Sequence, residues 1–420
     1  MTRKLASLQK ITAIRPIEGA DKIVAADVLG WTVVVGKDEF KVGDIAVYFE
    51  VDSWLDASNP AFAGFEQRFT NWGTKRGMRL KTIKLRKQLS QGLLMPVSKF
   101  PELMGYTLSA TIGGGEKFFS AGPGLFYDEG TDVTDILKIE KWESEEEARA
   151  NNPSTASHSR AFPWFLRKTD QQRVQNSLDA IAQTPDEETF EVTVKLDGSS
   201  MTVYYVGRAN PMFETLLAER EARELAKLGF FKKAVYKLRR KLGFVKRPEY
   251  LAGVCSRKVE LPLDGDNHFS AYVREHGVVE KILVTASPSD ALAFQGELIA
   301  PSIQKNYEKV AGYEWHVFDV FDIEKNEYLS PILARMATEF SGLQYVPVLD
   351  RRMSLASFRH EADASLTAQE SARAKVDNIL AFAEGPGMNK GVLREGIVFK
   401  SNKRDFSFKA VSNSYLLGKG

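Results

Sequence analysis

Lys195 is the residue in this sequence that is best placed to act as a nucleophile. It follows Val194 at the end of an apolar run, and a turn of small residues, 197–199, separates it from a second run that begins at Met201. This order puts a lysine at the mouth of a pocket, where Gly198 lets a ligand approach the backbone closely. An amine attacks only when it is unprotonated, so we expect burial or a nearby cation to lower its pKa from about 10.4. A plain hairpin with an exposed lysine is the alternative interpretation.

Later segments place charged or aromatic side chains beside apolar runs. Glu297 follows one run, and Glu395 precedes another that starts with glycine. Phe318 belongs to an aromatic-rich segment, 315–323, that could supply a stacking face, and Lys409 lies in a strand-like segment near the C-terminus. Each feature alone is a weak signal, but together they favour a binding pocket over an exposed hairpin.

The composition limits the classes to which the chain can belong. Its 420 residues predict two or three domains at about 150 residues each. With 57 Lys and Arg against 55 Asp and Glu, the net charge of +2 argues against a histone-like tail and an acidic disordered chain. One cysteine excludes an internal disulfide framework, and five scattered histidines argue against a zinc-finger cluster.

The apolar runs are short throughout. None approaches the roughly 18 residues of a membrane span, and the N-terminal segment lacks the apolar core of a signal peptide. We therefore expect a cytoplasmic protein with no membrane partner.

The elements that would position the candidate residues fall into two parts. Short β-branched runs separated by glycine turns near the N-terminus predict a small closed barrel. Residues 128–147 are rich in acidic side chains and lead into a polar stretch without periodicity, which is typical of an interdomain linker. From residue 162 onward strands alternate with longer helical stretches, and residues 367–384 predict an amphipathic helix.

The second part resembles the covalent nucleotidyltransferases, the superfamily of ATP-dependent RNA and DNA ligases and mRNA capping enzymes. Lys195-Leu196-Asp197-Gly198 matches the motif Lys-x-Asp-Gly, whose lysine becomes bonded to the nucleotide phosphate. The resemblance implies that Arg257 contacts the nucleotide, that Glu297 binds its ribose and that Phe318 stacks on its base.

The same resemblance implies further roles around the phosphates. Glu395 would lie near the catalytic metal, and Lys409 would contact the α-phosphate. The implied metal site comprises Asp197, Glu297 and Glu395. Other implied nucleotide contacts are Val194, Gly198, Arg173 and Lys400. These elements occur in the superfamily's order along the chain.

The N-terminal part narrows the resemblance to the Deinococcus/Naegleria-type RNA ligases. The segments that resemble this family are 17–23, 42–53, 85–93, 168–176 and 301–306. DNA ligases carry their OB domain after the transferase domain, whereas here it would come first. The implied fold is α+β, with an OB-type β-barrel at 1–140, a linker at 141–160 and a nucleotidyltransferase (ATP-grasp-like ligase) domain of antiparallel sheets and helices at 161–420.

The resemblance implies an ATP-dependent RNA ligase that uses Mg²⁺ or Mn²⁺. Lys195 would form lysyl-AMP, AMP would move to an RNA 5′-phosphate, and a 3′-OH would then displace AMP. The implied partner is RNA with 3′-OH and 5′-phosphate ends, with or without a bridging complementary strand, in RNA repair or nick sealing, and the protein is expected to be a monomer. The alternatives are a DNA ligase, a capping-type guanylyltransferase and a non-catalytic OB-fold RNA-binding protein.

Two basic segments and one departure from the superfamily pattern complete the predictions. The barrel residues expected to contact RNA are Lys75, Arg76, Arg79, Lys84, Arg86 and Lys87. The second basic segment is a helical insertion at 213–247, for which a solvated surface is an equal alternative. Ser407 stands where many superfamily members have a lysine, and Lys400 or the metal is the candidate for the missing charge.

Overall fold

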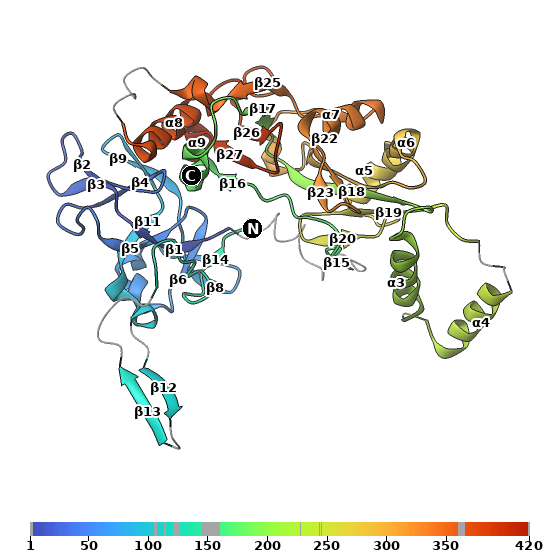
Figure 1. The fold of residues 1–420 in the computed structure, drawn as a ribbon, viewed down its shortest axis with the longest axis horizontal. Coiled ribbons are helices and arrows are strands. Elements are labelled where there is room, and N and C mark those ends of the chain that lie inside the picture. Colours follow the sequence, from blue (N-terminus) through green and yellow to red (C-terminus); the bar gives the residue numbers. More distant parts are fainter. Residues whose placement is uncertain are drawn as a thin grey trace.

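An N-terminal β-barrel and a larger C-terminal α+β domain lie side by side (Figure 1). The computed structural model describes residues 3–104, 107–112, 115–120, 127–143, 160–226, 228–242, 244, 246–359 and 366–418. Most of the predicted linker therefore lies outside the described residues, and the domain boundaries stay a prediction. The order of the two folds agrees with the sequence-based expectation.

The barrel is assembled from short antiparallel strands. The ladders run β1-β5-β11, β2-β3-β4, β9-β10 and β14-β6-β8-β7. Their bounds are β1 Ala6–Lys10, β2 Ala13–Pro16, β3 Ile23–Val28, β4 Trp31–Gly36, β5 Ile45–Phe49, β6 Ser53–Asp56, β7 Thr70–Trp72, β8 Lys75–Arg79, β9 Thr82–Leu85, β10 Gln88–Gln91, β11 Leu93–Pro96 and β14 Glu140–Lys141. A hairpin of β12 (Thr107–Ile112) and β13 (Gly115–Ser120) extends from it (Figure 1). Two apolar clusters fill the barrel, one around Phe49 and Phe62 and the other around Trp31 and Tyr48.

The C-terminal domain is built on two sheets. One has the order β15-β20-β19-β18-β21-β22-β23, with β24 beside β22, and the other has the order β16-β27-β26-β17-β25. The strands of the first are β15 Arg160–Ala161, β18 Ser199–Gly207, β19 Tyr250–Cys255, β20 Val259–Leu261, β21 Ala291–Ile299, β22 Glu314–Asp322, β23 Glu327–Tyr328 and β24 Gln344–Tyr345. Those of the second are β16 Gln172–Arg173, β17 Thr189–Lys195, β25 Val348–Ser354, β26 Gly396–Ser401 and β27 Ser407–Val411.

The chain crosses from one sheet to the other at the predicted nucleophile. β17 ends at Lys195 in the second sheet, and β18 begins at Ser199 in the first. Gly198 sits in the turn between them, where a Cβ atom would lie 2.4 Å from the carbonyl oxygen of Leu298 on β21. Only glycine allows the turn to approach β21 this closely.

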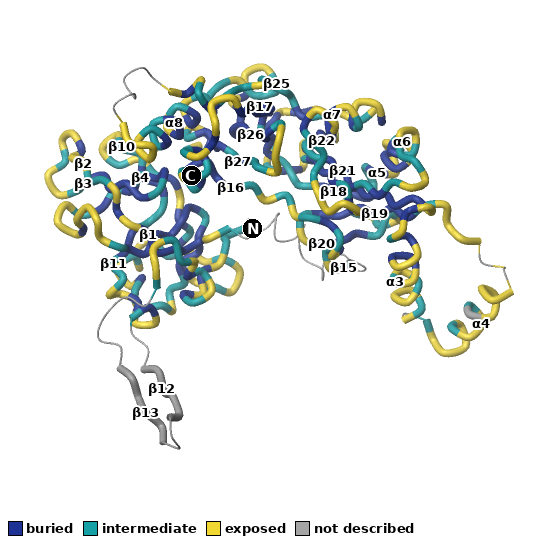
Figure 2. Tube along the Cα trace, in the orientation of Figure 1, coloured by how far each residue is buried: buried dark blue, intermediate teal, exposed yellow. Residues whose placement is uncertain are grey.

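Helices cover the sheets of the C-terminal domain. Their bounds are α2 Leu178–Ala182, α3 Phe213–Ala226, α4 Phe230–Lys241, α5 His268–Glu275, α6 Val278–Thr285, α7 Pro331–Phe340, α8 Ala368–Ala383 and α9 Asn413–Gly418. The predicted helix at 367–384 is α8, whose first turn carries a capping box between Thr367 and Glu370. The basic segment forms two helices, and Figure 2 shows α4 as largely exposed, in contrast to the sheets. None of the helices in the described part of the chain combines the length and apolar character needed to cross a bilayer.

The barrel docks onto the C-terminal domain through its β3–β4 turn. The backbone N–H of Gly30 donates to the carbonyl of Gln175 at 2.8 Å, and the indole of Trp31 donates to Asn176 at 2.6 Å. Arg373 of α8 donates to the carbonyl of Leu29 at 2.9 Å. A Cβ atom on Gly30 would lie 2.6 Å from the Cα of Gln175, so the junction leaves no space for a side chain there.

We predict that Gly30→Ala weakens this junction and lowers the free energy of unfolding by about 1–3 kcal/mol, because overpacking forces the backbones apart. Urea unfolding of the full chain, with limited proteolysis to report domain separation, measures the effect. Gly64→Ala is the matched control, since a Cβ on Gly64 meets no atom within 4 Å. Equal behaviour of the two variants would contradict a tight junction.

Candidate functional site

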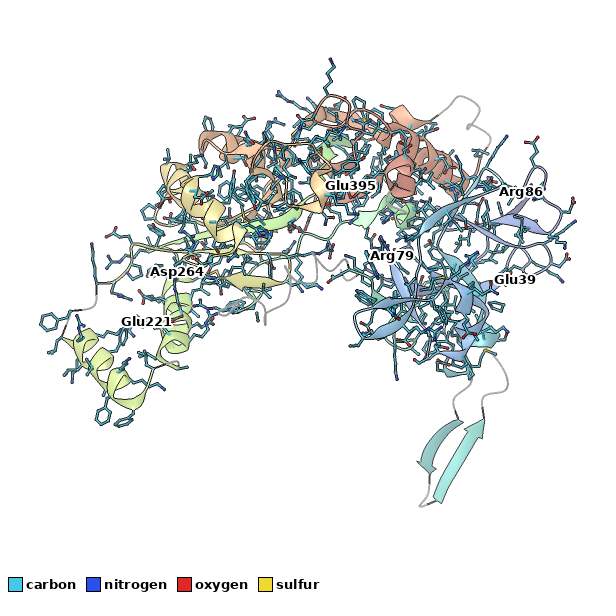
Figure 3. The ribbon with its side chains drawn as sticks, turned by 180° about the vertical axis from the view of Figure 1, so that it is seen from behind. Glu39, Arg79, Arg86, Glu221, Asp264 and Glu395 are labelled. Atoms are coloured by element: carbon cyan, nitrogen blue, oxygen red, sulfur yellow. The ribbon has the colours of Figure 1, made fainter. Side chains whose placement is uncertain are left out.

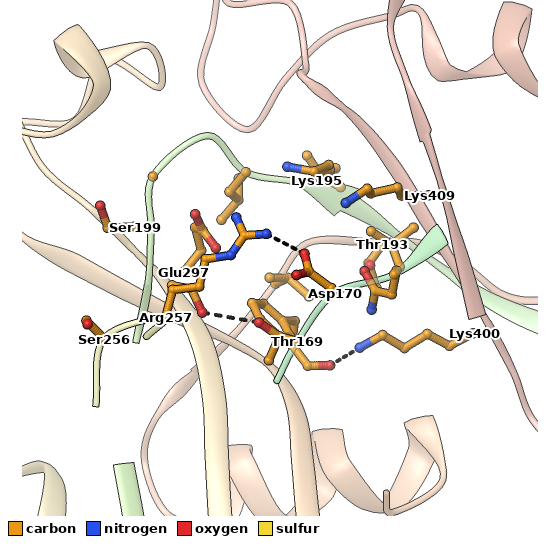
Figure 4. A pocket seen from close by; sticks show the side chains of 18 of the residues that line it. Thr169, Asp170, Thr193, Lys195, Ser199, Ser256, Arg257, Glu297, Lys400 and Lys409 are labelled. Carbon is orange, nitrogen blue, oxygen red and sulfur yellow. Dashed lines mark hydrogen bonds and ion pairs between the residues drawn. The ribbon is translucent and has the colours of Figure 1, made fainter. Parts of the chain in front are cut away.

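A pocket opens between the two sheets beside Lys195 (Figure 4). Most of the predicted site residues line it: Val194, Lys195, Gly198, Arg257, Glu297, Phe318, Lys400 and Lys409. Asp197 and Glu395 are buried next to Lys195, outside the pocket lining. The structure thus brings together side chains that are spread over more than half of the sequence.

The Lys195 ammonium is ion-paired with Glu395. Its Nζ lies 2.6 Å from Oε2 of Glu395. The pairing follows from the antiparallel ladder of β17 and β26, in which Lys195 lies opposite Gly396 and therefore next to Glu395. The carboxylate expected near the metal consequently touches the expected nucleophile directly.

The expected fall in the pKa of Lys195 is wrong for the protein without ligand. Burial acts to lower this pKa, but Glu395, Glu297 and Asp197 raise it by more, so the net shift is upward. Opposite charges stabilise the ammonium form more than desolvation disfavours it. The site as it stands holds a protonated lysine, and only the arrival of compensating positive charge would release the amine.

A buried carboxylate that sequence reasoning missed supports the turn that follows Lys195. Oε1 of Glu308 accepts the backbone N–H of Asp197 at 3.1 Å, while its Oε2 is buried with no hydrogen-bond partner. Burial, aided by Glu395 and Asp197, raises the pKa of Glu308 to about 7. Burial likewise raises the pKa of Glu297, to about 8. In both cases burial is the largest cause, and neighbouring acidic groups add to it.

An unusual loop brings Glu308 to this position. Gln304, Lys305 and Asn306 all have left-handed backbone, with φ of 49°, 57° and 52°. Such a run is stable only where surrounding contacts enforce it. Here the Asn306 side chain accepts from the backbone N–H of Val310 at 2.9 Å and donates to its carbonyl at 3.0 Å.

Helix α9 also contacts the turn that follows Lys195. The Tyr415 phenol hydrogen-bonds Asp197, and burial together with Glu395 and Asp197 raises the pKa of that phenol. At the start of α9, Gln91 of the barrel donates to Asn413 at 3.2 Å. No sequence pattern singled out Tyr415, because a single tyrosine on a six-residue helix carries no periodic signal.

The pocket's aromatic wall depends on a β-bulge. In the ladder of β21 and β22, Gln295 faces Asp319 and Gly296 faces Val317, which leaves Phe318 as the extra residue. A bulge re-aims side chains, and here it turns Phe318 toward the pocket. Arg257, another residue of the pocket lining, is ion-paired with Asp170, which also lines the pocket and was not predicted (Figure 4).

Lys400 lies opposite Ser407 across the ladder of β26 and β27. It therefore occupies the neighbourhood of the lysine that the superfamily pattern would place at 407. Its Nζ lies 2.8 Å from Oδ1 of Asp319 and also donates to the carbonyl of Phe318. Lys400 thus places a positive charge beside Phe318, but the ion pair with Asp319 largely neutralises that charge.

Two further predicted residues lie between the pocket and the barrel. Burial, with the charges of Lys195 and Arg173, lowers the pKa of Lys409 to about 7. Arg173 does not line the pocket but is buried at the domain junction, 3.7 Å from Asp52 and over the ring of Trp31. Its Nε and Nη1 are buried without a hydrogen-bond partner.

Family comparisons agree with this geometry. A family model described as an OB-fold domain matches residues 5–97, and one described as RNA ligase matches residues 188–411, more than half of the chain.

The chain belongs to the RNA ligase family.

Solved structures of a Naegleria gruberi RNA ligase extend the match over the whole molecule. A variant with AMP and Mn is 35% identical, with 100% of this chain and 99% of that chain covered and a TM-score of 0.73. A variant with ATP and Mn is 34% identical over 99% of both chains, with a TM-score of 0.71. A search of curated proteins finds no match.

The barrel residues predicted to contact RNA do not form one patch on this RNA ligase. Lys75 is ion-paired with Glu140, and Arg79 lies 2.7 Å from Asp52 and stacks on Trp142. Arg79 and Arg86 lie well apart on the barrel (Figure 3). The members that remain exposed are Arg76, Lys84, Arg86 and Lys87.

The acidic groups of the ligase suit a hydrated cation better than a directly ligated one. Among the described residues, no cluster of three or more His, Cys, Asp or Glu is arranged to hold a metal ion. The buried Glu308 oxygen without a partner is nevertheless the kind of acceptor that a metal-bound water satisfies. The carboxylates around Lys195 therefore fit a hard divalent cation held through water.

We predict that Lys409 reacts faster than Lys195 with an amine-acylating reagent at pH 8 in the nucleotide-free protein. The pKa of Lys409 is about 7 and that of Lys195 is raised, so only Lys409 is mostly unprotonated at this pH. Competitive labelling followed by peptide mass spectrometry measures both residues, which line the same pocket. Below about pH 6 both should be unreactive, and faster labelling of Lys195 at pH 8 would overturn the assigned order.

Proposed function

We propose that this protein is an ATP-dependent RNA ligase that joins RNA 3′-OH and 5′-phosphate ends through lysyl-AMP and an adenylylated 5′ end. The observation that carries the proposal is Lys195, which lies in a pocket with an aromatic wall, is ion-paired with Glu395 and is surrounded by further carboxylates. Solved relatives with ATP or AMP and Mn support the same nucleotide and metal.

The proposed reaction is a series of displacements at phosphorus. The unprotonated Lys195 Nζ bonds to the α-phosphorus of ATP, the bond to the bridging oxygen breaks, and pyrophosphate leaves. An oxygen of the RNA 5′-phosphate then attacks the same phosphorus and displaces the lysine. In the last step the RNA 3′-OH attacks the 5′-phosphorus and AMP leaves.

The pocket residues supply binding and charge for these steps. In the proposal, Phe318 stacks on adenine, Glu297 binds the ribose, and Val194, Gly198 and Lys400 complete the nucleotide pocket. Lys409, Arg257 and Arg173 face phosphate oxygens. The two buried, unpartnered nitrogens of Arg173 support a phosphate ligand near the junction, because a guanidinium left unsatisfied in the interior is costly.

Mg²⁺ or Mn²⁺ would be held through water by Asp197, Glu297 and Glu395, and we add Glu308 to this set. When bound, the cation stabilises charge on the phosphate oxygens and offsets the carboxylates that keep the pKa of Lys195 high. Glu308 would act by fixing the backbone of Asp197, and Tyr415 by orienting its carboxylate.

We further propose that the RNA crosses the barrel, with or without a complementary strand to bridge the ends, and that the protein acts as a monomer in RNA repair or nick sealing. The exposed Arg76, Lys84, Arg86 and Lys87 would contact phosphates, which bind by charge without regard to base sequence.

Lys195→Ala should abolish the covalent protein–AMP product formed from labelled ATP with Mg²⁺, because in the proposal Lys195 supplies the bond to phosphorus and Lys409, in the same pocket, only contacts phosphate oxygens. Gel autoradiography measures the product, and GTP in place of ATP tests for a capping-type enzyme. The variant should still ligate RNA that is already adenylylated at its 5′ end, since that step does not need the lysine. Normal labelling of Lys195→Ala would refute the assignment, and sealing of DNA but not RNA would refute the substrate.

Arg86→Glu combined with Lys87→Glu should weaken RNA binding and make the dependence of log Kd on log salt shallower by about 1.5, as expected when two phosphate contacts are lost. Fluorescence anisotropy over a salt series measures this slope. Lys37→Glu combined with Lys41→Glu is the matched control for general loss of positive charge on the barrel. An unchanged slope in the Arg86/Lys87 variant would show that these side chains are merely solvated.

A further inference from the structure

Helix α4 carries an apolar face that is uncovered in the described part of the chain. Its members are Phe231, Val235, Leu238 and Leu242, which recur at helical spacing and are 57–83% exposed. Phe230 and Phe244, at the two ends, are exposed as well. A helix of a globular domain normally buries such a stripe against a core. Here no residue in the described part of the chain covers the stripe.

The rest of the α4 surface is basic. Exposed or half-exposed cations occupy the remaining sides of the helix: Lys232, Lys233, Arg239, Arg240 and Lys241. No acidic residue occurs between positions 225 and 248 of the sequence. The helix therefore combines an apolar stripe with a polar face on which every charged residue is positive, a pattern typical of helices that lie on anionic surfaces.

The placement of α4 presents this surface outward. The neighbouring α3 is anchored in the domain core by Phe213, Leu216 and Leu217. α4 is held to α3 by an ion pair between Arg240 and Glu221, and it lies at the end of the molecule away from the barrel (Figures 1 and 3). A single helix that projects from the domain can insert its apolar side chains into a deformable surface such as a lipid bilayer.

We propose that α4 is an interfacial helix through which the protein binds an anionic lipid surface. Apolar side chains would enter the boundary between headgroups and acyl chains while the flanking lysines and arginines meet lipid phosphates and carboxylates. RNA alone would account for the cations but leaves the Phe, Val and Leu stripe without a partner. The sequence-based expectation of no membrane partner rested on the absence of a spanning segment, and a twelve-residue helix lying on a surface needs none.

Co-sedimentation of the full-length protein with vesicles tests the proposal. We expect binding to vesicles of phosphatidylcholine with phosphatidylserine, little binding to phosphatidylcholine alone, and weaker binding as salt rises. Phe231→Ser with Leu238→Ser should reduce the affinity by about tenfold or more, since two buried apolar side chains are lost. Arg239→Glu with Lys241→Glu should also reduce the affinity for anionic vesicles, and the reduction should be larger at low salt than at high salt.

Ile332→Ser with Phe340→Ser is the matched control. These α7 residues are also more than half exposed, but the one basic residue of that helix, Arg335, is buried. The control should bind vesicles like the parent, and formation of protein–AMP should be unchanged in every variant. Equal vesicle binding by parent and α4 variants would overturn the proposal. Two other results would also overturn it, in each case if the parent protein does not bind vesicles. One is that the Phe231→Ser, Leu238→Ser variant loses RNA binding. The other is that light scattering shows a dimer for the parent and not for this variant.

Discussion

The structure depends on holding one ammonium group among buried carboxylates at the point where the chain passes between two sheets. β17 delivers Lys195 from one sheet, and the turn with Gly198 pins its next residues against the other. An isolated charge in such a place would be expelled or neutralised, so the Glu395 partner is a condition of the fold as well as of the chemistry. The same pairing keeps the amine protonated until other positive charge arrives. In the proposed reaction, activation of Lys195 therefore depends on the ligand that supplies this charge.

Part of this arrangement was predictable because two of the residues stand at strand ends. Lys195 is the last residue of β17 and Glu395 directly precedes β26, and strand pairing brings them together. Glu297 instead lies inside β21, and its place in the site follows from the pairing of β21 with β18. Glu308 and Tyr415 were missed because their positions come from tertiary structure, a left-handed loop in one case and a short terminal helix in the other. The expected direction of the Lys195 pKa was wrong for a related reason, since the sequence shows burial but not how many carboxylates converge.

The sequence has nearly equal numbers of basic and acidic residues, but the structure distributes them unevenly. Some form local ion pairs, and others gather on exposed surfaces. Lys75 and Arg79, which looked like part of an RNA track, are engaged with acidic groups of the barrel itself. A run of like charges in sequence therefore overestimates the surface available to a polyanion. α4 differs, because only Arg240 among its described cations is ion-paired with an acidic residue, Glu221, and the cations surround an apolar stripe that the charge count alone would not reveal.

Helix α9 gives the molecule a property that neither domain has alone. Asn413 at its start is bonded to Gln91 of the barrel, and Tyr415 within it is bonded to Asp197 beside the lysine. One short helix thus contacts both the barrel and the turn that follows Lys195. Displacement of the barrel relative to α9 would strain the hydrogen bond that Tyr415 makes to Asp197, so the two domains do not pack independently of each other.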